Sequence, residues 1–445
     1  MEILNLRLLR VAVMAAAAGL ASGGVYAHGD KHAAHNDKSG GHHGAAAPAG
    51  PCADPTALPS LNCAKSPTPA FSHDGRLWIT WYSRGHIYIQ HSDDNGATFS
   101  APQAVNPIPE PVDDQGEDRP QVALGPRNEI YLLWTRKLEK PYTGHIRFSR
   151  SLDGGRTFSA PINVNDDKDV IAHRFPTFRV NDRGEIFVVW VDKRDLEAAK
   201  AANKEYAGAA LYYGVSTDNG ASFQTSRKLS DNSCECCRIA MELDEQGLPV
   251  ILYRQVFDGG VRDHAVITFS DLTTHSTPQR VSDDQWKLDG CPHHGPALAA
   301  SGDRQHLAWF TAGENRQGLF YAHSSKDGFS QPMAFGGPGA ERPMIEALGD
   351  HVVLTWKAFA DDRTRTFMQI SEDGGDSWSA ATEVVNTEGA SDHPLLVNDG
   401  DKIYLSWQTA QEGYRLTPLP ESNAEVAANA SIKNAESHHE HKESL

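Results

Sequence analysis

Beyond its N-terminus, the sequence lacks any long hydrophobic run and any excess of basic charge. A membrane-spanning helix needs about 18 or more consecutive apolar residues, and no later segment approaches that length. The formal net charge is −17 at pH 7, and an acidic protein repels phosphate backbones. These absences exclude a membrane span and argue against nucleic acid as a partner. We expect a soluble protein whose surface attracts cations.

Cysteine is scarce, and its six residues fall into two separate groups. Cys52 and Cys63 lie near the N-terminus, where a local Cys52–Cys63 disulfide is the simplest prediction. The other four are Cys234, Cys236, Cys237 and Cys291. Three of these crowd into "SCECCR", and the fourth stands in "DGCPHHGP" beside two histidines. The sequence therefore raises the question of whether these two segments meet in space.

The first 27 residues have the pattern of a secretory signal peptide. Arg7 and Arg10 form a positive region, residues 11–20 form a short apolar stretch, and "VYA" at 25–27 fits a small-residue cleavage site. The apolar stretch is too short to span a bilayer. We therefore predict cleavage after residue 27 and a periplasmic or secreted location, in which disulfides are permitted.

Both ends of the remaining chain are low in complexity and rich in histidine. One tract covers residues 28–50, and a polar tail covers residues 416–445 and closes with "ESHHEHKESL". Such segments cannot bury enough apolar surface to build a core, so we expect both to be disordered. Imidazole groups in two separate tails favour loose capture of copper, zinc or nickel, and a solubilising role is the alternative.

Between these ends runs a repeated motif with the pattern S-x-D-x-G-x-[ST]-[FW]. Its clear copies are "SDDNGATF", "SLDGGRTF", "STDNGASF" and "SEDGGDSW", which begin at Ser92, Ser151, Ser216 and Ser371. The aspartate can accept hydrogen bonds from nearby backbone N–H groups, and the glycine can adopt the positive φ that a Cβ disfavours. Each copy follows an alternating run such as "HIYIQHS" and precedes a short strand pattern. The motif therefore predicts a hairpin turn.

A second repeated element is an apolar strand that ends in an aromatic residue, as in "RLWITW", "EIYLLW" and "EIFVVW". The aromatic residues recur at a period of about 50 residues, and they are Trp81, Trp134, Trp190, Tyr253, Trp309, Trp356 and Trp407. A four-strand unit with this period is typical of a β-propeller blade.

We therefore predict an all-β fold, a β-propeller of four-stranded blades over residues 51–415. Seven blades are favoured, and six blades with an added unit are the alternative. The last unit lacks the turn motif and a fourth strand, so residues 58–65 are predicted to complete it. Residues 195–208, "DLEAAKAANKEYAG", have good helix formers and no strand pattern, and they predict a helical insertion in the third unit.

The turn motif resembles the Asp-box, or BNR repeat, of bacterial sialidases and their non-enzymatic relatives, over about residues 66–410. The resemblance implies a sialidase-like β-propeller. It also implies one activity, an exo-glycoside hydrolase that binds an acidic sugar through arginines at the propeller axis. The candidate arginines are Arg119, Arg174, Arg238 and Arg342. No tyrosine stands where the family's nucleophile is expected, so no catalytic residue is carried over.

Blade topology predicts where a site would lie. The Asp-box turns join third and fourth strands on one face, whereas the starts of the first strands converge on the axis at the opposite face. Besides the arginines, the units supply at this position Asp118, His173, Cys234, Cys236, Cys237, Cys291, His293, His294, Glu341, Asp392 and His393. We therefore expect the two cysteine segments to be neighbours at the mouth of the central channel.

Thiolate and imidazole groups together suit copper(I) or zinc, so the sequence predicts a transition-metal site, with copper favoured and zinc possible. The predicted ligands are Cys234, Cys236, Cys237, Cys291, His293 and His294, with His173 and His393 as further axial candidates. A disulfide such as Cys234–Cys291 is the alternative for the cysteines, and bonds between neighbouring blades are the alternative for the arginines. The main hypothesis is an exported metal-handling or metal-binding protein. The acidic-sugar hydrolase and a plain scaffold are the other two.

Overall fold

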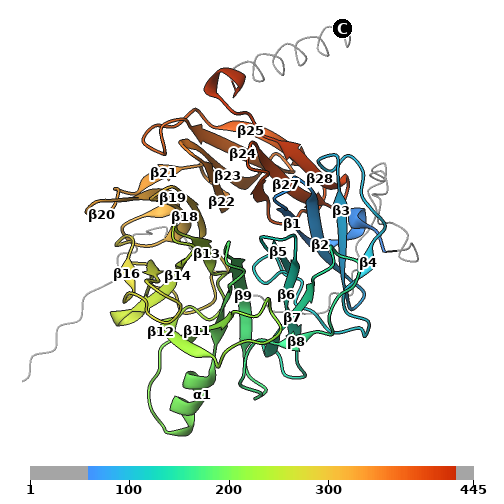
Figure 1. The fold of residues 1–445 in the computed structure, drawn as a ribbon. Coiled ribbons are helices and arrows are strands. Elements are labelled where there is room, and N and C mark those ends of the chain that lie inside the picture. The colour runs from blue at the N-terminus through green and yellow to red at the C-terminus, as the bar shows by residue number, and fades with distance from the viewer. Residues whose placement is uncertain (1–58, 427–445) are drawn as a thin grey trace, which may run out of the picture. The chain divides into compact units, whose positions relative to one another are not determined.

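The computed structural model describes residues 59–426, and within them the fold is all-β (Figure 1). The predicted signal peptide, the segment 28–50 and Cys52 lie outside the described residues, as do residues 427–445. No helix in the described part is both long enough and apolar enough to cross a membrane. The strands form successive antiparallel sets in chain order.

The first four sets account for the N-terminal half of the fold. The first is β1 (Lys65–Phe71), β2 (Leu77–Ser83), β3 (His86–Ser92) and β4 (Gln103–Ala104). The second is β5 (Gln121–Leu124), β6 (Ile130–Lys137), β7 (Gly144–Ser151) and β8 (Ile162–Asn163). The third is β9 (His173–Val180), β10 (Ile186–Asp192), β11 (Ala209–Ser216) and β12 (Arg227–Ser233). The fourth is β13 (Ala240–Leu243), β14 (Pro249–Phe257), β15 (Val261–Thr268) and β16 (Gln279–Arg280).

Three further sets complete the described fold. The fifth is β17 (Ala297–Ser301), β18 (Arg304–Ala312), β19 (Gln317–Ser325), β20 (Gly328–Phe329) and β21 (Met333–Phe335). The sixth is β22 (Ala340–Leu348), β23 (His351–Ala360), β24 (Arg363–Ser371) and β25 (Thr382–Thr387). The last has three strands, β26 (Leu395–Asn398), β27 (Ile403–Thr409) and β28 (Gly413–Pro418).

The first strands of these sets surround a common axis. β1, β5, β9, β13, β17, β22 and β26 contact one another in this order, and β26 contacts β1. Figure 1 shows the sets placed around this centre, with their later strands further out. The third and fourth sets form a single hydrogen-bonded sheet, because Ser233 in β12 pairs with Gln255 in β14. The all-β architecture is confirmed, whereas the count of seven blades stays a prediction.

Each second strand buries one of the repeated aromatic residues. Their side chains are no more than 2% exposed in every set, namely Trp81, Trp134, Trp190, Tyr253, Trp309, Trp356 and Trp407. The apolar clusters lie between adjacent sets, as where Leu133 and Phe148 of one set pack with Phe178 and Val188 of the next. Because each set covers a face of its neighbour, the core is divided around the ring.

The repeated turns form as the motif predicts. In the first copy, the N–H and hydroxyl of Thr98 donate to Asp94 at 2.8 and 2.6 Å, and the Gly96 N–H donates to the Ser92 hydroxyl at 2.8 Å. The same bonds recur around Asp153, Asp218 and Asp373. The Thr98 bonds lower the pKa of Asp94 to about 2. These turns join third and fourth strands and are structural.

Three local predictions need correction or adjustment. A short 3-10 helix, η1 (Leu61–Cys63), lies where a closing strand was expected, so that prediction is wrong for the described residues of segment 58–65. This turn still docks on the last set, because Gln408 donates to the Asn62 carbonyl at 2.8 Å. The inserted helix α1 (Arg194–Ala201) forms but ends before residue 208. At the C-terminal end, Leu419 and Val426 are buried, so ordered structure continues past the predicted boundary at 415.

Candidate functional site

The two cysteine segments meet at the axial face. Cys234, Cys236 and Cys237 follow β12, whereas Cys291 and His293 precede β17. The Cys234 sulfur lies 3.0 Å from that of Cys237 and 3.9 Å from that of Cys236. A second group joins Cys236, Cys291 and His293, with one ligand atom from each within 4.8 Å of the others. The predicted proximity of the two segments is therefore confirmed.

The inner three thiols are buried, and the outer group reaches the surface. Cys234, Cys236 and Cys237 are 1%, 5% and 3% exposed and pack in an apolar cluster with Phe175 and Tyr253. A buried thiol by itself behaves as a small apolar side chain. Burial for packing does not explain the second group, however, because Cys291 and His293 are exposed. Within the described part, the four clustered cysteines are free thiols, and the alternative Cys234–Cys291 disulfide is not formed.

The thiols share protons, and cationic groups lie beside them. Hydrogen bonds from Cys236 and Cys237 hold the pKa of Cys234 well below its usual range, and Arg254 adds to this effect. A hydrogen bond from Cys236 likewise lowers the pKa of Cys291 to about 7. The guanidinium of Arg262 lies 3.6 Å from the Cys234 sulfur. The surroundings therefore favour thiolate at Cys234 and Cys291. The hydrogen bond to Cys234 raises the pKa of Cys236, and burial raises the pKa of Cys237, so these two thiols would release their protons as a metal binds.

Three predicted histidine ligands lie elsewhere, and none joins either cysteine group in the described structure. The His294 ring stacks on Phe310 with centroids 4.2 Å apart, and burial lowers the pKa of His294 to about 3. The ring of His173 contacts the Gly144 carbonyl at 2.9 Å, at the start of β9. His393 lies 3.7 Å from the carboxylate of Glu117, at the axis.

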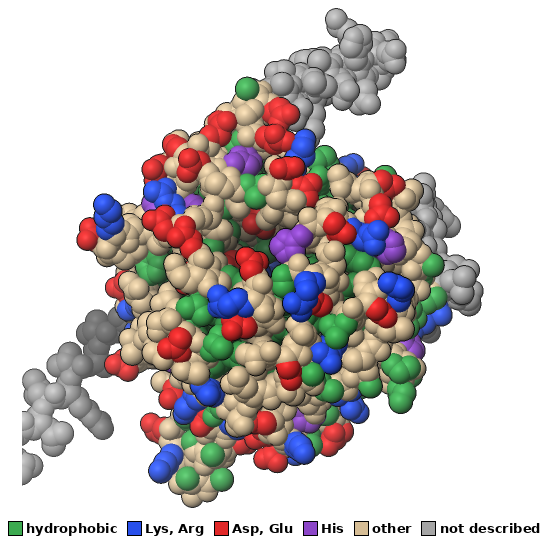
Figure 2. All heavy atoms as spheres, viewed as in Figure 1, with side chains coloured by type: hydrophobic (Ala, Val, Ile, Leu, Met, Phe, Trp, Pro, Cys, Tyr) green, Lys and Arg blue, Asp and Glu red, His purple; other side chains and the backbone are tan. Residues whose placement is uncertain are grey.

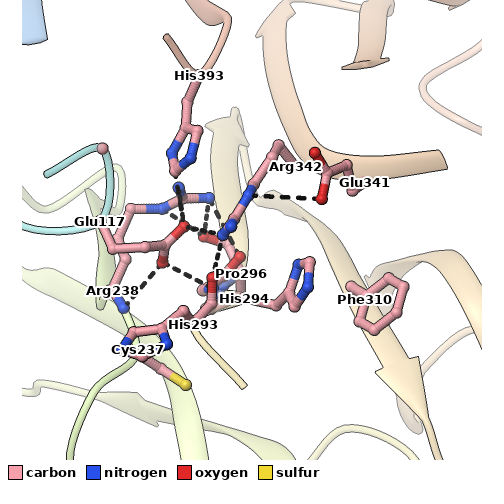
Figure 3. Close-up of polar contacts among 12 residues, drawn as sticks. Glu117, Cys237, Arg238, His293, His294, Pro296, Phe310, Glu341, Arg342 and His393 are labelled. Atoms are coloured by element: carbon pink, nitrogen blue, oxygen red, sulfur yellow. Dashed lines mark hydrogen bonds and ion pairs between the residues drawn. The ribbon is translucent and has the colours of Figure 1, made fainter. Parts of the chain in front are cut away.

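Glu117, which no sequence pattern singled out, occupies the centre of the axial contacts (Figure 3). Its carboxylate accepts the backbone N–H groups of Arg238 at 3.2 Å and Gly295 at 2.9 Å. It also accepts the guanidinium groups of Arg238 at 3.3 Å and Arg342 at 2.8 Å. Burial would raise the pKa of Glu117, but the two arginines outweigh burial and lower it. One carboxylate thus ties together the loop after Cys237 and the loop after His293.

The arginines at the axis bond to neighbouring sets and to carboxylates. Arg119 donates to the Pro67 carbonyl at 3.2 Å and pairs with Asp392 at 2.8 Å. Arg238 donates to the Pro296 carbonyl at 3.2 Å, and Arg342 donates to the carbonyl of His293. For these three arginines, the alternative of bonds between neighbouring sets is confirmed.

Arg174 is separated from the other arginines by its own acidic partners. Its guanidinium pairs with Asp113 and lies 3.4 Å from Asp118. The structure therefore brings together Arg119, Arg238 and Arg342, the first paired with Asp392 and the other two with Glu117, while Arg174 serves a separate ion-pair group. Every candidate arginine already has a carboxylate partner.

The backbone is strained where the axial contacts are made. Arg342 and His293 have φ values of 56° and 50°, in a left-handed region that costs a non-glycine residue about 1–3 kcal/mol. Such conformations persist only where surrounding contacts hold them. Here the bond from Arg342 to the His293 carbonyl joins the two strained positions.

Behind the axial contacts lies a channel enclosed by the first strands. Its cavity is about 460 Å³ and is lined by Glu117 and Arg238 near the strand starts and by Arg179, Glu242 and Glu346 further along. Burial and the charge of Glu242 raise the pKa of Glu346 to about 7. Figure 2 shows charged and histidine side chains gathered around a hollow over the centre of the ring. The channel therefore combines these charged groups with apolar side chains of the first strands, such as Met344 and Leu396.

Comparison with known proteins identifies the fold but no family. No family model matches the chain, and no curated protein matches it. An ulvan lyase of polysaccharide lyase family PL25 superposes with a TM-score of 0.51 at 12% identity, covering 82% of this chain and 97% of the lyase. The polysaccharide lyase Uly1 gives 0.50 at 11% identity, with 82% and 91% covered. The Hadza microbial sialidase Hz136 gives 0.47 at 11% identity, with 77% and 76% covered.

The two superpositions with a TM-score of at least 0.50 support a propeller fold, and both are with proteins named as polysaccharide lyases. At such low identity they show the fold alone, because one fold hosts many unrelated activities. Function must be argued from the site.

Proposed function

We propose that this protein binds a thiophilic transition-metal ion at its axial face, with copper(I) favoured over zinc, as a metal-binding or metal-handling protein. The proposed ligands are Cys234, Cys236, Cys237, Cys291 and His293. One observation carries the proposal: four free thiols and an imidazole form two overlapping groups of three donors. Thiolate sulfur selects soft ions such as copper(I) and zinc.

The number of donors separates the two metals. Structural zinc is almost always held by four ligands in a tetrahedron. Each group here offers three donors, and Cys236 is the only member they share. Copper(I) is stable with fewer soft ligands, so the arrangement favours copper.

The proposal also includes the location of the protein and the number of its blades. We propose a seven-bladed propeller that is exported after loss of residues 1–27, with a Cys52–Cys63 disulfide. Seven first strands in a closed cycle of contacts and seven buried aromatic residues support the blade count. The His-rich tracts, which lie outside the described residues, would capture copper, zinc or nickel loosely through their imidazole groups.

Removing two central thiols should abolish stoichiometric metal binding. In a Cys236→Ser, Cys237→Ser variant neither group keeps three donors, so we expect copper to fall from at least one ion per chain to background. Elemental analysis of the reduced full chain, after a wash with a chelator that strips imidazole-bound ions, measures this loss. Exposed His73 provides the control, and His73→Ala should keep the wild-type content. Equal, negligible copper and zinc in wild type and double variant would refute the proposal.

A second candidate function is the binding or cleavage of an acidic polysaccharide. It is favoured by the two lyase neighbours and by the basic groups at the channel mouth, Arg119, Arg238, Arg342 and Lys357. These groups already pair with Asp392, Glu117 and Glu341. A sugar carboxylate would therefore have to displace protein carboxylates, which weakens this candidate relative to metal binding.

Activity assays on two substrates test this second candidate. Ulvan cleavage by a lyase yields ultraviolet-absorbing unsaturated ends, and a fluorogenic sialoside reports hydrolysis. We expect no turnover of either substrate. Turnover that is lost in Arg342→Ala but kept in the Arg363→Ala control, whose arginine pairs with peripheral Glu388, would establish the enzyme instead.

A further inference from the structure

The five proposed ligands form two sets of donors rather than one. Cys234, Cys236 and Cys237 lie within 4.8 Å of one another, as do Cys236, Cys291 and His293. Metal–sulfur bonds are about 2.3 Å long, so two donors to one ion lie at most about 4.6 Å apart. The 4.8 Å within which each set lies is close to this distance, so each set is near the size that one ion needs. The five ligand atoms do not all lie within 4.8 Å of one another, because only Cys236 belongs to both sets.

From this arrangement we infer that the axial site holds two copper(I) ions, an inner and an outer one, bridged by the sulfur of Cys236. The inner ion is bound by Cys234, Cys236 and Cys237, and the outer ion by Cys236, Cys291 and His293. A thiolate sulfur has lone pairs for two ions. This inference rests on the proposed function. It specifies how many copper ions the axial site holds and which of them exchanges more readily.

The charges around the site suit such a pair. Four thiolates and two copper(I) ions give −4 + 2 = −2, and this surplus lies among guanidinium groups. Arg262 lies 3.6 Å from the Cys234 sulfur, and Arg254 and Arg174 interact electrostatically with Cys234 and Cys236. A buried charge needs such partners nearby.

Burial assigns different roles to the two positions. The inner thiols are at most 5% exposed, so an ion held there is shielded from competing ligands. Cys291 and His293 are exposed, so the outer position can receive an ion from solution or from a donor. Through Cys236 the outer ion can pass inward by ligand exchange, without dissociating. The outer ion is therefore exchangeable and the inner ion retained.

Anaerobic titration of the reduced full chain with copper(I), buffered by a chromophoric copper(I) chelator, tests this arrangement. At the concentration used for the titration, the chelator keeps copper off imidazole-only sites in the tails but leaves the thiolate sites loaded; a large excess of chelator is used only to measure release. We expect two ions per wild-type chain and two for the His73→Ala control. A Cys291→Ser, His293→Ala variant and a Cys234→Ser, Cys237→Ser variant should each bind one. Circular dichroism and melting curves establish that each variant is folded.

The outcomes separate this inference from the proposed function. A wild-type plateau at one ion, or above two, overturns the inference but leaves metal binding intact. A plateau at zero overturns both. A pair variant that binds none while wild type binds two would show one interdependent cluster and overturn the division into inner and outer ions. Release of copper to excess chelator should also be biphasic in wild type, and a single phase would contradict distinct exchange rates.

Discussion

Replacing Glu117 with alanine should lower the free energy of unfolding by about 3 kcal/mol, because it removes the counter-charge of the largely buried Arg238 and leaves Arg342 only with Glu341 at 4.0 Å. The Glu117 side chain is 5% exposed, and those of Arg238 and Arg342 are 18% and 17% exposed. The change also frees the N–H groups of Arg238 and Gly295. Because these groups flank the two cysteine loops, the outer copper should bind more weakly. Denaturant midpoints and copper titration measure the two effects.

Glu110 supplies a matched control for Glu117. Its side chain is 11% exposed, pairs with Arg147 at 3.0 Å and accepts the indole N–H of Trp134 at 3.3 Å. Glu110→Ala should therefore destabilise the fold but leave copper binding unchanged. An unaltered midpoint for Glu117→Ala, or equal loss of copper in both variants, would contradict the role assigned to Glu117.

The charge of Glu117 also predicts a pH dependence. Arg238 and Arg342 hold the pKa of Glu117 below its ordinary value in the folded state. A lowered folded-state pKa gives stability that is present above the ordinary pKa and lost as the pH falls through the folded-state pKa. The stability gap between wild type and Glu117→Gln should therefore be widest near neutral pH and should shrink in acid.

The repeat could be recognised in the sequence because each unit builds the same turn from residues that lie close together in the chain. Asp94 and Thr98 bond within one turn, so the motif survives as a short pattern. Ring closure is different, because it joins distant segments and needs no motif. Segment 58–65 therefore gave no sign that η1 would form a turn against Gln408 instead of a strand. Likewise, Leu419 and Val426 are isolated apolar residues near a polar tail, and tertiary contacts alone bury them.

The candidate site was predictable to the level of loops but not of side chains. Equivalent positions in successive units brought Cys236 near Cys291, as expected from repeat register. Within an irregular loop no periodicity fixes which way a side chain turns. His294 thus stacks on Phe310 and leaves His293 as the potential ligand. The sequence pointed to Asp118 at this position, but the carboxylate that reaches the two cysteine loops is that of Glu117, one residue earlier.

Gly295→Ala should separate the two cysteine loops and remove the outer copper ion while leaving the inner one. A Cβ at Gly295 would lie 2.4 Å from the Arg238 Cβ, 2.8 Å from the Arg238 carbonyl oxygen and 2.7 Å from the Glu117 carboxylate. Two of these atoms belong to a neighbouring loop close to its backbone, so the loops must move apart. Overpacking of this kind costs about 1–3 kcal/mol.

The two donor sets should respond differently to that movement. Cys234, Cys236 and Cys237 come from one loop and move together, whereas the outer set joins Cys236 to Cys291 and His293 across the gap. Titration with copper(I) should therefore fall from two ions to one. Gly290→Ala is the matched control in the same loop, because a Cβ there has only Leu288 at 4.0 Å, and it should keep both ions. Retention of two ions by Gly295→Ala would show that close contact of the loops is not needed for the outer site.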